Sequence, residues 1–87
     1  MFSIIIECDG DYWHANPKIY NSSNLTKTQI TNVKRDKFKD IYLAKKGWKV
    51  FRFFELDIHK NFKNCIDILE AEINEQIKSI KNPLDEL

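Results

Sequence analysis

The sequence predicts a small α/β domain whose elements follow the order strand, helix, strand, helix. Segments 2–9 and 48–55 are rich in the β-branched and aromatic residues that favour strands, whereas 28–46 and 60–80 carry apolar residues at helical spacing. With 87 residues, of which 43% are hydrophobic and 13% aromatic, the chain can build one core and is too short for two domains. We therefore expect residues 1–87 to form a single domain.

The first predicted strand, 2–9, contains three consecutive isoleucines and ends at the turn-forming sequence Asp-Gly-Asp. Because side chains alternate between the faces of a strand, Glu7 and Asp9 should project from the same face at its carboxyl end. Open α/β sheets usually bind their ligands at that end.

A loop is predicted from Gly10 to Thr26, and a helix should follow over 28–46. Thr26 or Thr28 is the candidate N-cap, and Gly47 is placed to end the helix. Two stripes with helical spacing lie on different faces of this helix. The stripe expected to be core consists of Ile30, Val33, Ile41 and Ala44; the other, a candidate site, consists of Asn32, Asp36, Lys39 and Leu43.

The second predicted strand, 48–55, follows the first through a loop and a helix, which favours parallel pairing. Nearly continuous apolarity in both strands predicts a sheet that is covered on both faces. The last helix, 60–80, has an apolar stripe that we expect to pack in the core. This stripe consists of Phe62, Cys65, Ile66, Leu69, Ile73, Ile77 and Ile80.

Charge is distributed unevenly although the net charge is only +1. Residues 27–49 contain eight bases against two acids, a net of +6, and they follow a segment that carries Glu7, Asp9 and Asp11. Bases suit phosphates and acids suit cations, as a protein that acts on a polyanion through metal ions requires. The alternative is a solvated helix face.

Cys8 and Cys65 show neither the spacing of a zinc site nor that of a disulfide framework, which predicts free thiols in a reducing compartment. The amino-terminal apolar run has no basic residue before it and is far shorter than the ~18 residues that span a bilayer. We therefore expect an intracellular protein with no membrane partner.

Three motifs carry chemistry: IIIECDGDYWH at 4–14, NVKRDKFKD at 32–40 and GWKVFRFFE at 47–55. In this order and spacing they resemble the very-short-patch repair endonuclease family and its relatives among phage and intron homing endonucleases. That family is a branch of the PD-(D/E)XK nuclease superfamily. The resemblance implies a restriction-endonuclease-like fold, of which this chain would be the βαβα core, whole or truncated. It also implies a location in the cytoplasm of a bacterial or phage-infected cell.

The activity implied by the resemblance is hydrolysis of phosphodiesters in double-stranded DNA, by a repair-type nickase or a homing endonuclease that depends on Mg²⁺ or Mn²⁺. An imidazole can take a proton from a metal-polarised water near neutral pH. The implied metal ligands are Glu7, the backbone carbonyl of Cys8, Asp9 and Asp36. The implied catalytic residues are His14 as general base or acid, Asp36 as its partner, Glu7 as metal ligand and Lys39 as phosphate or transition-state contact.

The resemblance also implies that Tyr12 and Trp13 insert their rings into the DNA stack, with packing of Trp13 beneath the loop as the alternative. Lys34, Arg35 and Lys37 are the expected phosphate contacts. Arg52 and Glu55 match the family's strand pattern, and we expect them to pair with neighbouring charges.

The family has further metal-anchoring acids before this first strand, and this chain begins within the strand. Three interpretations follow: a fragment of a longer nuclease, a chain whose missing acids come from another chain, or a protein that binds DNA without cutting it. The second function considered is therefore a non-catalytic DNA-binding or interaction module. An exposed strand edge also predicts a homodimer or pairing with a complementing nuclease fragment.

Overall fold

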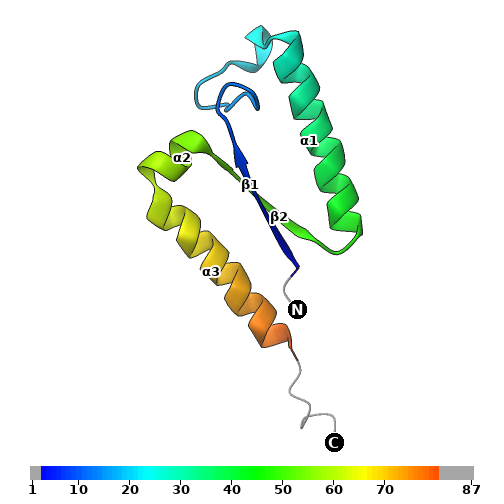
Figure 1. Ribbon diagram of the computed structural model, residues 1–87, viewed down its shortest axis with the longest axis vertical. Coiled ribbons are helices and arrows are strands. Elements are labelled where there is room, and N and C mark those ends of the chain that lie inside the picture. Colours follow the sequence, from blue (N-terminus) through cyan, green and yellow to red (C-terminus); the bar gives the residue numbers. More distant parts are fainter. Residues whose placement is uncertain (1–2, 81–87) are drawn as a thin grey trace, which may run out of the picture.

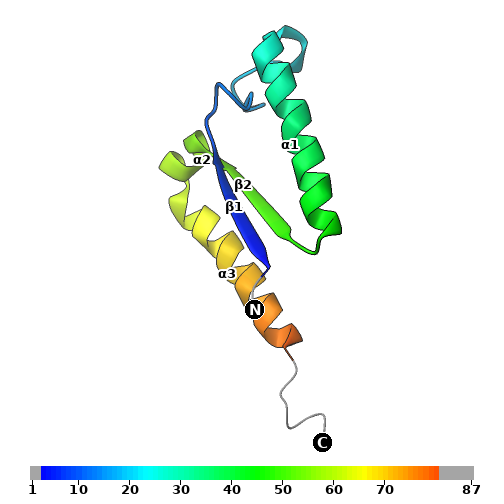
Figure 2. The same cartoon turned by 45° about the vertical axis from the view of Figure 1, so that its right-hand side comes forward.

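The computed structural model describes residues 3–80 as two parallel strands lying between two long helices. In both Figure 1 and Figure 2, α1 lies on one side of the strand pair and α3 on the other. The mixed α/β class and the parallel strand pair are confirmed. The elements are β1 (Ile4–Asp9), the 3₁₀ turn η1 (Ser22–Asn24), α1 (Lys27–Lys45), β2 (Lys49–Phe54), α2 (Glu55–Lys60) and α3 (Phe62–Ser79).

The strands pair in a single continuous register, from Ile4 opposite Lys49 to Asp9 opposite Phe54. Paired residues share a face of the sheet, so Glu7 lies beside Arg52. Both side chains contact acids or bases of α1, which identifies this as the α1 face of the sheet. The strand register therefore places two charged side chains, Glu7 and Arg52, side by side in a largely apolar strand pair.

Both ends of α1 have well-defined caps. Thr26 is the N-cap and forms a capping box with Gln29, in which each side chain accepts a hydrogen bond from the other residue's backbone. At the other end Gly47 has φ 89°, and the amides of Gly47 and Trp48 donate to the carbonyls of Ala44 and Leu43. This Schellman motif explains why the helix ends before Gly47, as predicted.

The segment between β1 and α1 is tied down by buried polar groups. Asn16 is 1% exposed; its backbone carbonyl accepts from the amides of Ile19 and Tyr20, and its side chain donates to Asp11. The same Asp11 carboxylate accepts from the backbone amide of Leu56 at the start of α2. These bonds join the predicted loop to the end of the second strand.

The last predicted helix, 60–80, corresponds to α3 with bounds that agree within two residues, but the short helix α2 before it was not predicted. Glu55 begins α2 instead of ending the strand, and α2 and α3 are separated at Asn61, whose φ of −136° and ψ of 44° are not helical. The Asn61 backbone amide donates to the Asp57 carbonyl of α2, and the Asn61 carbonyl accepts from the Cys65 amide of α3. Asparagine favours such boundaries because its side chain competes for backbone hydrogen bonds.

The molecule is thin, measuring 59 × 29 × 15 Å along its principal axes, so few side chains have neighbours on every side. The buried residues are Asp9, Ala15, Asn16, Gln29 and Cys65. The expectation that both apolar helix stripes form core is wrong for most of their members. Exposed members are Ile30, Ile41 and Ala44 on α1, and Phe62, Ile73, Ile77 and Ile80 on the last helix and its end.

The expectation of a fully covered sheet is also wrong, because Ile6 is 51% exposed and Cys8 is exposed beside it. Both cysteines are free thiols. Across residues 3–80, none of the helices is sufficiently long and apolar to cross a membrane.

Candidate active site

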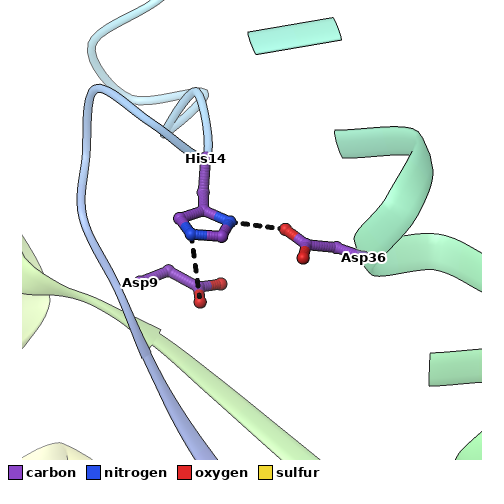
Figure 3. Close-up of side chains that lie close together, drawn as sticks. All are labelled: Asp9, His14 and Asp36. Atoms are coloured by element: carbon purple, nitrogen blue, oxygen red, sulfur yellow. Dashed lines mark hydrogen bonds and ion pairs between the residues drawn. The ribbon is translucent and has the colours of Figure 1, made fainter. Parts of the chain in front are cut away.

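Three side chains from three segments converge at the carboxyl end of β1. Asp9 ends the strand, His14 lies in the following loop and Asp36 is on α1 (Figure 3). Each offers one potential ligand atom, and these atoms lie within 4.8 Å of one another. Asp9 is buried, whereas His14 and Asp36 are partly exposed, so the cluster is open to solvent on one side.

The imidazole of His14 is oriented by Asp36, whose Oδ2 lies 2.6 Å from Nδ1. Because an ionised carboxylate can only accept, Nδ1 carries the proton of this bond. In the neutral ring Nε2 is then an acceptor, and it faces Asp9 Oδ1 at 3.9 Å, too far for a direct hydrogen bond. The arrangement leaves a basic nitrogen pointing into a gap beside a carboxylate.

Arg52 on β2 holds the surrounding carboxylates together. Its Nη1 donates to both oxygens of Asp9 at 3.2 Å and lies 3.6 Å from Asp36 Oδ1. Its Nε and Nη2 donate to Asp40 at 2.8 to 3.0 Å. The bond to Asp40, as the main cause, raises the pKa of Arg52 far above its ordinary value, against the opposing effect of burial.

Glu7 and Lys39, also predicted site residues, form a pair of their own. Lys39 Nζ on α1 donates to Glu7 Oε1 at 2.7 Å. Glu7 shares the α1 face of the strand pair with Asp9, but it is not one of the three side chains of the Asp9, His14 and Asp36 cluster. The side chain of Cys8, between them, is exposed.

Two amides of α1 position the loop that carries His14. Gln29, which is 2% exposed, donates to the Tyr12 carbonyl at 2.7 Å, and Asn32 donates to the Trp13 carbonyl at 2.9 Å. Ala15, directly after His14, has φ 51°, in the left-handed region. The backbone around His14 is thus fixed by side-chain bonds from the helix and by a bend that non-glycine residues seldom adopt.

The predicted DNA contacts lie outside the cluster. Tyr12 and Trp13 are 43% and 58% exposed, and their rings pack edge to face with centroids 5.0 Å apart. Packing of Trp13 beneath the loop is therefore wrong. The side chains of Lys34, Arg35 and Lys37 are exposed on α1, and within residues 3–80 they make no ion pair with the cluster.

The sequence analysis missed several residues that shape the site. Gln29 lies three positions before Asn32, so an extension of the candidate stripe toward the amino terminus would have included it. Asp40 lies one turn after Asp36, and Arg52 was expected only to pair with neighbouring charges. Pairing across 43 residues between Arg52 and Asp9 has no signal in the local sequence.

The donor set suits a divalent cation. The carboxylates of Asp9 and Asp36 are ligands that Mg²⁺ and Mn²⁺ prefer, and an imidazole nitrogen extends the range to softer metals. A cation at Asp9 would compete with Arg52, which retains shorter bonds to Asp40.

Comparison with known proteins gives one informative similarity. The chain is 33% identical over 67 residues to the type II nicking enzyme V.HpaIIP of Haemophilus parainfluenzae. The alignment covers 69% of this chain and 48% of that enzyme, so the chain spans about half the length of the curated relative it matches. No family model matches the chain, and no solved structure matches it. The similarity indicates a nuclease-related relationship.

Proposed function

We propose that this chain carries the catalytic residues of a metal-dependent DNA endonuclease that resembles very-short-patch repair and homing endonucleases, on a PD-(D/E)XK fold. The observation that carries the proposal is the convergence of Asp9, His14 and Asp36 with the imidazole held by Asp36. The similarity to a nicking enzyme supports DNA as the substrate and a nick as the product.

In the proposed mechanism, Asp9 and Asp36 would hold the cation, with Glu7 on the same face of β1 as Asp9. A bound Mg²⁺ or Mn²⁺ would polarise a water and neutralise phosphate charge. His14 Nε2 accepts a proton from the attacking water. Its Nδ1–H stays hydrogen-bonded to Asp36, and the negative charge of that carboxylate stabilises the imidazolium. The new P–O bond forms as the bond to the leaving oxygen of the DNA strand breaks.

Lys39 is placed to contact phosphate in this mechanism. Its ammonium is 2.7 Å from Glu7 Oε1, and half of the side chain is exposed. Transfer of Lys39 from Glu7 to a phosphate oxygen would release the Glu7 carboxylate and place positive charge where negative charge develops. Lys34, Arg35 and Lys37 would contact the DNA backbone on either side of the cut.

A second function, DNA binding without cleavage, is favoured by the position of Arg52. Both oxygens of Asp9 already receive hydrogen bonds from the guanidinium, which neutralises this carboxylate without a cation. In that case the cluster would be a structural ion network, and the basic α1 and the exposed rings of Tyr12 and Trp13 would remain available for DNA.

The experiment that separates the two functions measures conversion of supercoiled plasmid to nicked or linear DNA with Mg²⁺ or Mn²⁺ at low salt. Wild type is compared with His14→Ala and with His59→Ala, which changes an exposed histidine on α2. We expect His14→Ala to cut about 100-fold more slowly or worse, because a general base contributes at least that factor, and His59→Ala to cut normally.

Equal cutting by wild type and His14→Ala would reject the assignment of His14. If neither protein cuts but both retard DNA in a gel, the chain binds DNA without hydrolysing it. Retardation lost on raising the salt would show that phosphate contacts provide the affinity.

A further inference from the structure

An open cavity of about 780 Å³ adjoins the cluster, and His14 forms part of its wall. The remaining wall comes from the segment between β1 and α1, from α1 itself and from the end of β2. Lining residues used below are His14, Lys18, Tyr20, Asn21, Leu25 and Phe54. Ligand sites in proteins have volumes of roughly 300 to 1,000 Å³, so the cavity is large enough for a nucleoside.

The lining is mainly apolar, with a few neutral hydrogen-bonding groups. Leu25 and Phe54 contribute apolar surface, while the Asn21 side-chain oxygen accepts from the amide and hydroxyl of Ser23, which leaves its amide group to donate. Lys18, a lining residue with a full positive charge, donates to Asp57 at 2.6 Å. The chemistry fits a flat, neutral ring with polar edges better than it fits a phosphate.

A row of aromatic rings leads from the surface to this cavity. Trp13 packs against Tyr12 with ring centroids 5.0 Å apart, and Tyr12 packs against Tyr20 at 5.8 Å, both edge to face. Tyr20 lines the cavity, whereas Trp13 is 58% exposed. Aromatic side chains of this kind bind unpaired nucleobases by stacking, with little regard to base identity.

We propose that the cavity receives a nucleobase of the DNA strand whose phosphodiester lies at His14, with Tyr20 and Phe54 in contact with the base. This inference rests on the proposed function, because the shared wall at His14 is what relates the cavity to the scissile phosphate. A base leaves the stack at least cost where its pairing is already weak. The contacts in the cavity must therefore offset the cost of taking a paired base out of the stack.

The direct test is titration of the ¹⁵N-labelled chain with thymidine 5′-monophosphate, followed by NMR and compared with deoxyribose 5-phosphate, which lacks the base. We expect saturable shifts of the amides of residues 18–25 with the nucleotide and not with the sugar phosphate. Tyr20→Ala should weaken nucleotide binding about tenfold, because stacking contributes roughly 1–3 kcal/mol per base.

Tyr42→Ala is the matched control, since Tyr42 is 60% exposed on α1 and does not line the cavity. If Tyr20→Ala unfolds, Val33→Phe reduces the cavity from the α1 side and should also weaken binding. Equal shifts with the sugar phosphate, or no shifts at residues 18–25, would overturn the proposal.

The failure of this inference is distinguishable from failure of the proposed function. Plasmid cutting without nucleotide shifts at the cavity would overturn the base-binding site and leave the nuclease intact. Nucleotide shifts without plasmid cutting would support the cavity as a base-binding site and reject the nuclease activity.

Discussion

His14 has two nitrogen atoms in different environments, and this difference defines what the residue can do. Nδ1 is bonded to Asp36 at 2.6 Å, and Nε2 faces Asp9 across 3.9 Å. A water in that gap would be within reach of both Nε2 and the Asp9 carboxylate, and it could donate to either. The chemistry proposed above depends on this geometry and on the charge of Asp36.

Replacement of Asp36 by asparagine tests that dependence. The amide keeps the shape of the side chain but lacks the charge that stabilises an imidazolium, so we expect plasmid nicking to fall about 100-fold or more. Asp67→Asn, at an exposed α3 position paired with Lys63, is the control. Nicking by Asp36→Asn at the wild-type rate, with an unchanged melting temperature, would contradict the proposed role.

Arg52→Gln tests whether cations and the guanidinium compete for Asp9. Asp9 is 4% exposed, and loss of one partner of a buried ion pair typically costs about 3–5 kcal/mol. We therefore expect a lower melting temperature for the variant. Mn²⁺ should raise that temperature more in the variant than in wild type, because it can replace the missing positive charge.

Lys49→Gln is the control for Arg52→Gln, since Lys49 pairs with Glu72 on the α3 side and its side chain is 64% exposed. It should leave the response to Mn²⁺ unchanged. An identical response to Mn²⁺ in wild type and Arg52→Gln would mean that Mn²⁺ and the guanidinium do not compete for Asp9.

At this scale the sequence predicted the position of Asp9 and the stripe that contains Asp36, because strand alternation and helical spacing are local rules. It did not predict which carboxylates would meet Arg52, since that depends on strand register and helix rotation. The assignment of catalytic roles to His14 and Lys39 stays a prediction.

Among the elements, α1 shows most clearly which features of a helix can be predicted from the sequence pattern and which cannot. Its extent and both caps followed from Thr26 and Gly47 to within one residue. The choice of buried face was wrong: the helix turns its polar stripe toward the strands, where Asn32, Asp36 and Lys39 each make a bond. Helical periodicity identifies the two faces of α1. It does not show which face is buried when the polar face can form hydrogen bonds and ion pairs with other segments.

The short helix α2 was not predicted, for a different reason. With six residues, from Glu55 to Lys60, it is too short to show an apolar stripe, and the predicted strand included its first residue. Its first turn is joined to the segment after β1, because the Asp11 carboxylate accepts from the Leu56 amide. A contact between segments so far apart in the chain cannot be predicted from the local sequence.

The attachment of α3 to the strands should depend on pH through Glu72. Lys49 Nζ donates to Glu72 Oε2 at 3.4 Å and lies 3.0 Å from Oε1, and this hydrogen bond is the main cause of the lowered pKa of the Glu72 carboxyl group. A pKa lower in the folded than in the unfolded state stabilises the fold above the unfolded value. That stabilisation is lost as pH falls through the folded pKa.

We therefore expect Glu72→Gln to lower the urea midpoint at pH 7 and to have a smaller effect at an acidic pH below the folded pKa, where the carboxyl is protonated in wild type too. Glu75→Gln, at an exposed position of the same helix, controls for the change in net charge. An effect of Glu72→Gln that is the same at both pH values would contradict this account.

Many large hydrophobic side chains are exposed among residues 3–80. Phe38 is 75% exposed, and with Lys34, Lys37 and Ile41 it lines a second hollow of about 240 Å³ on α1. Within the described residues each of the two strands also has an edge that pairs with no other strand. Unpaired edges and apolar patches favour association between chains.

We expect sedimentation equilibrium at micromolar concentration to give a mass above the 10.4 kDa of one chain. Phe38→Glu should shift the distribution toward monomer if the α1 hollow is the interface, whereas Phe62→Glu, at an exposed position that begins α3, should not. A mass near 10.4 kDa for wild type would refute the predicted dimer.

The parallel register also has a kinetic consequence. Every partner across the strand pair is 45 positions away in the chain, as Ile4 opposite Lys49 illustrates, so the strands can meet only after a long loop has closed. Contacts of such high contact order form slowly, whereas α1 can form early from its own capped sequence. The bond between Arg52 and Asp9 is thus made only when folding is nearly complete. A ligand that binds at the carboxyl end of the sheet will therefore bind the native state and not the folding intermediates.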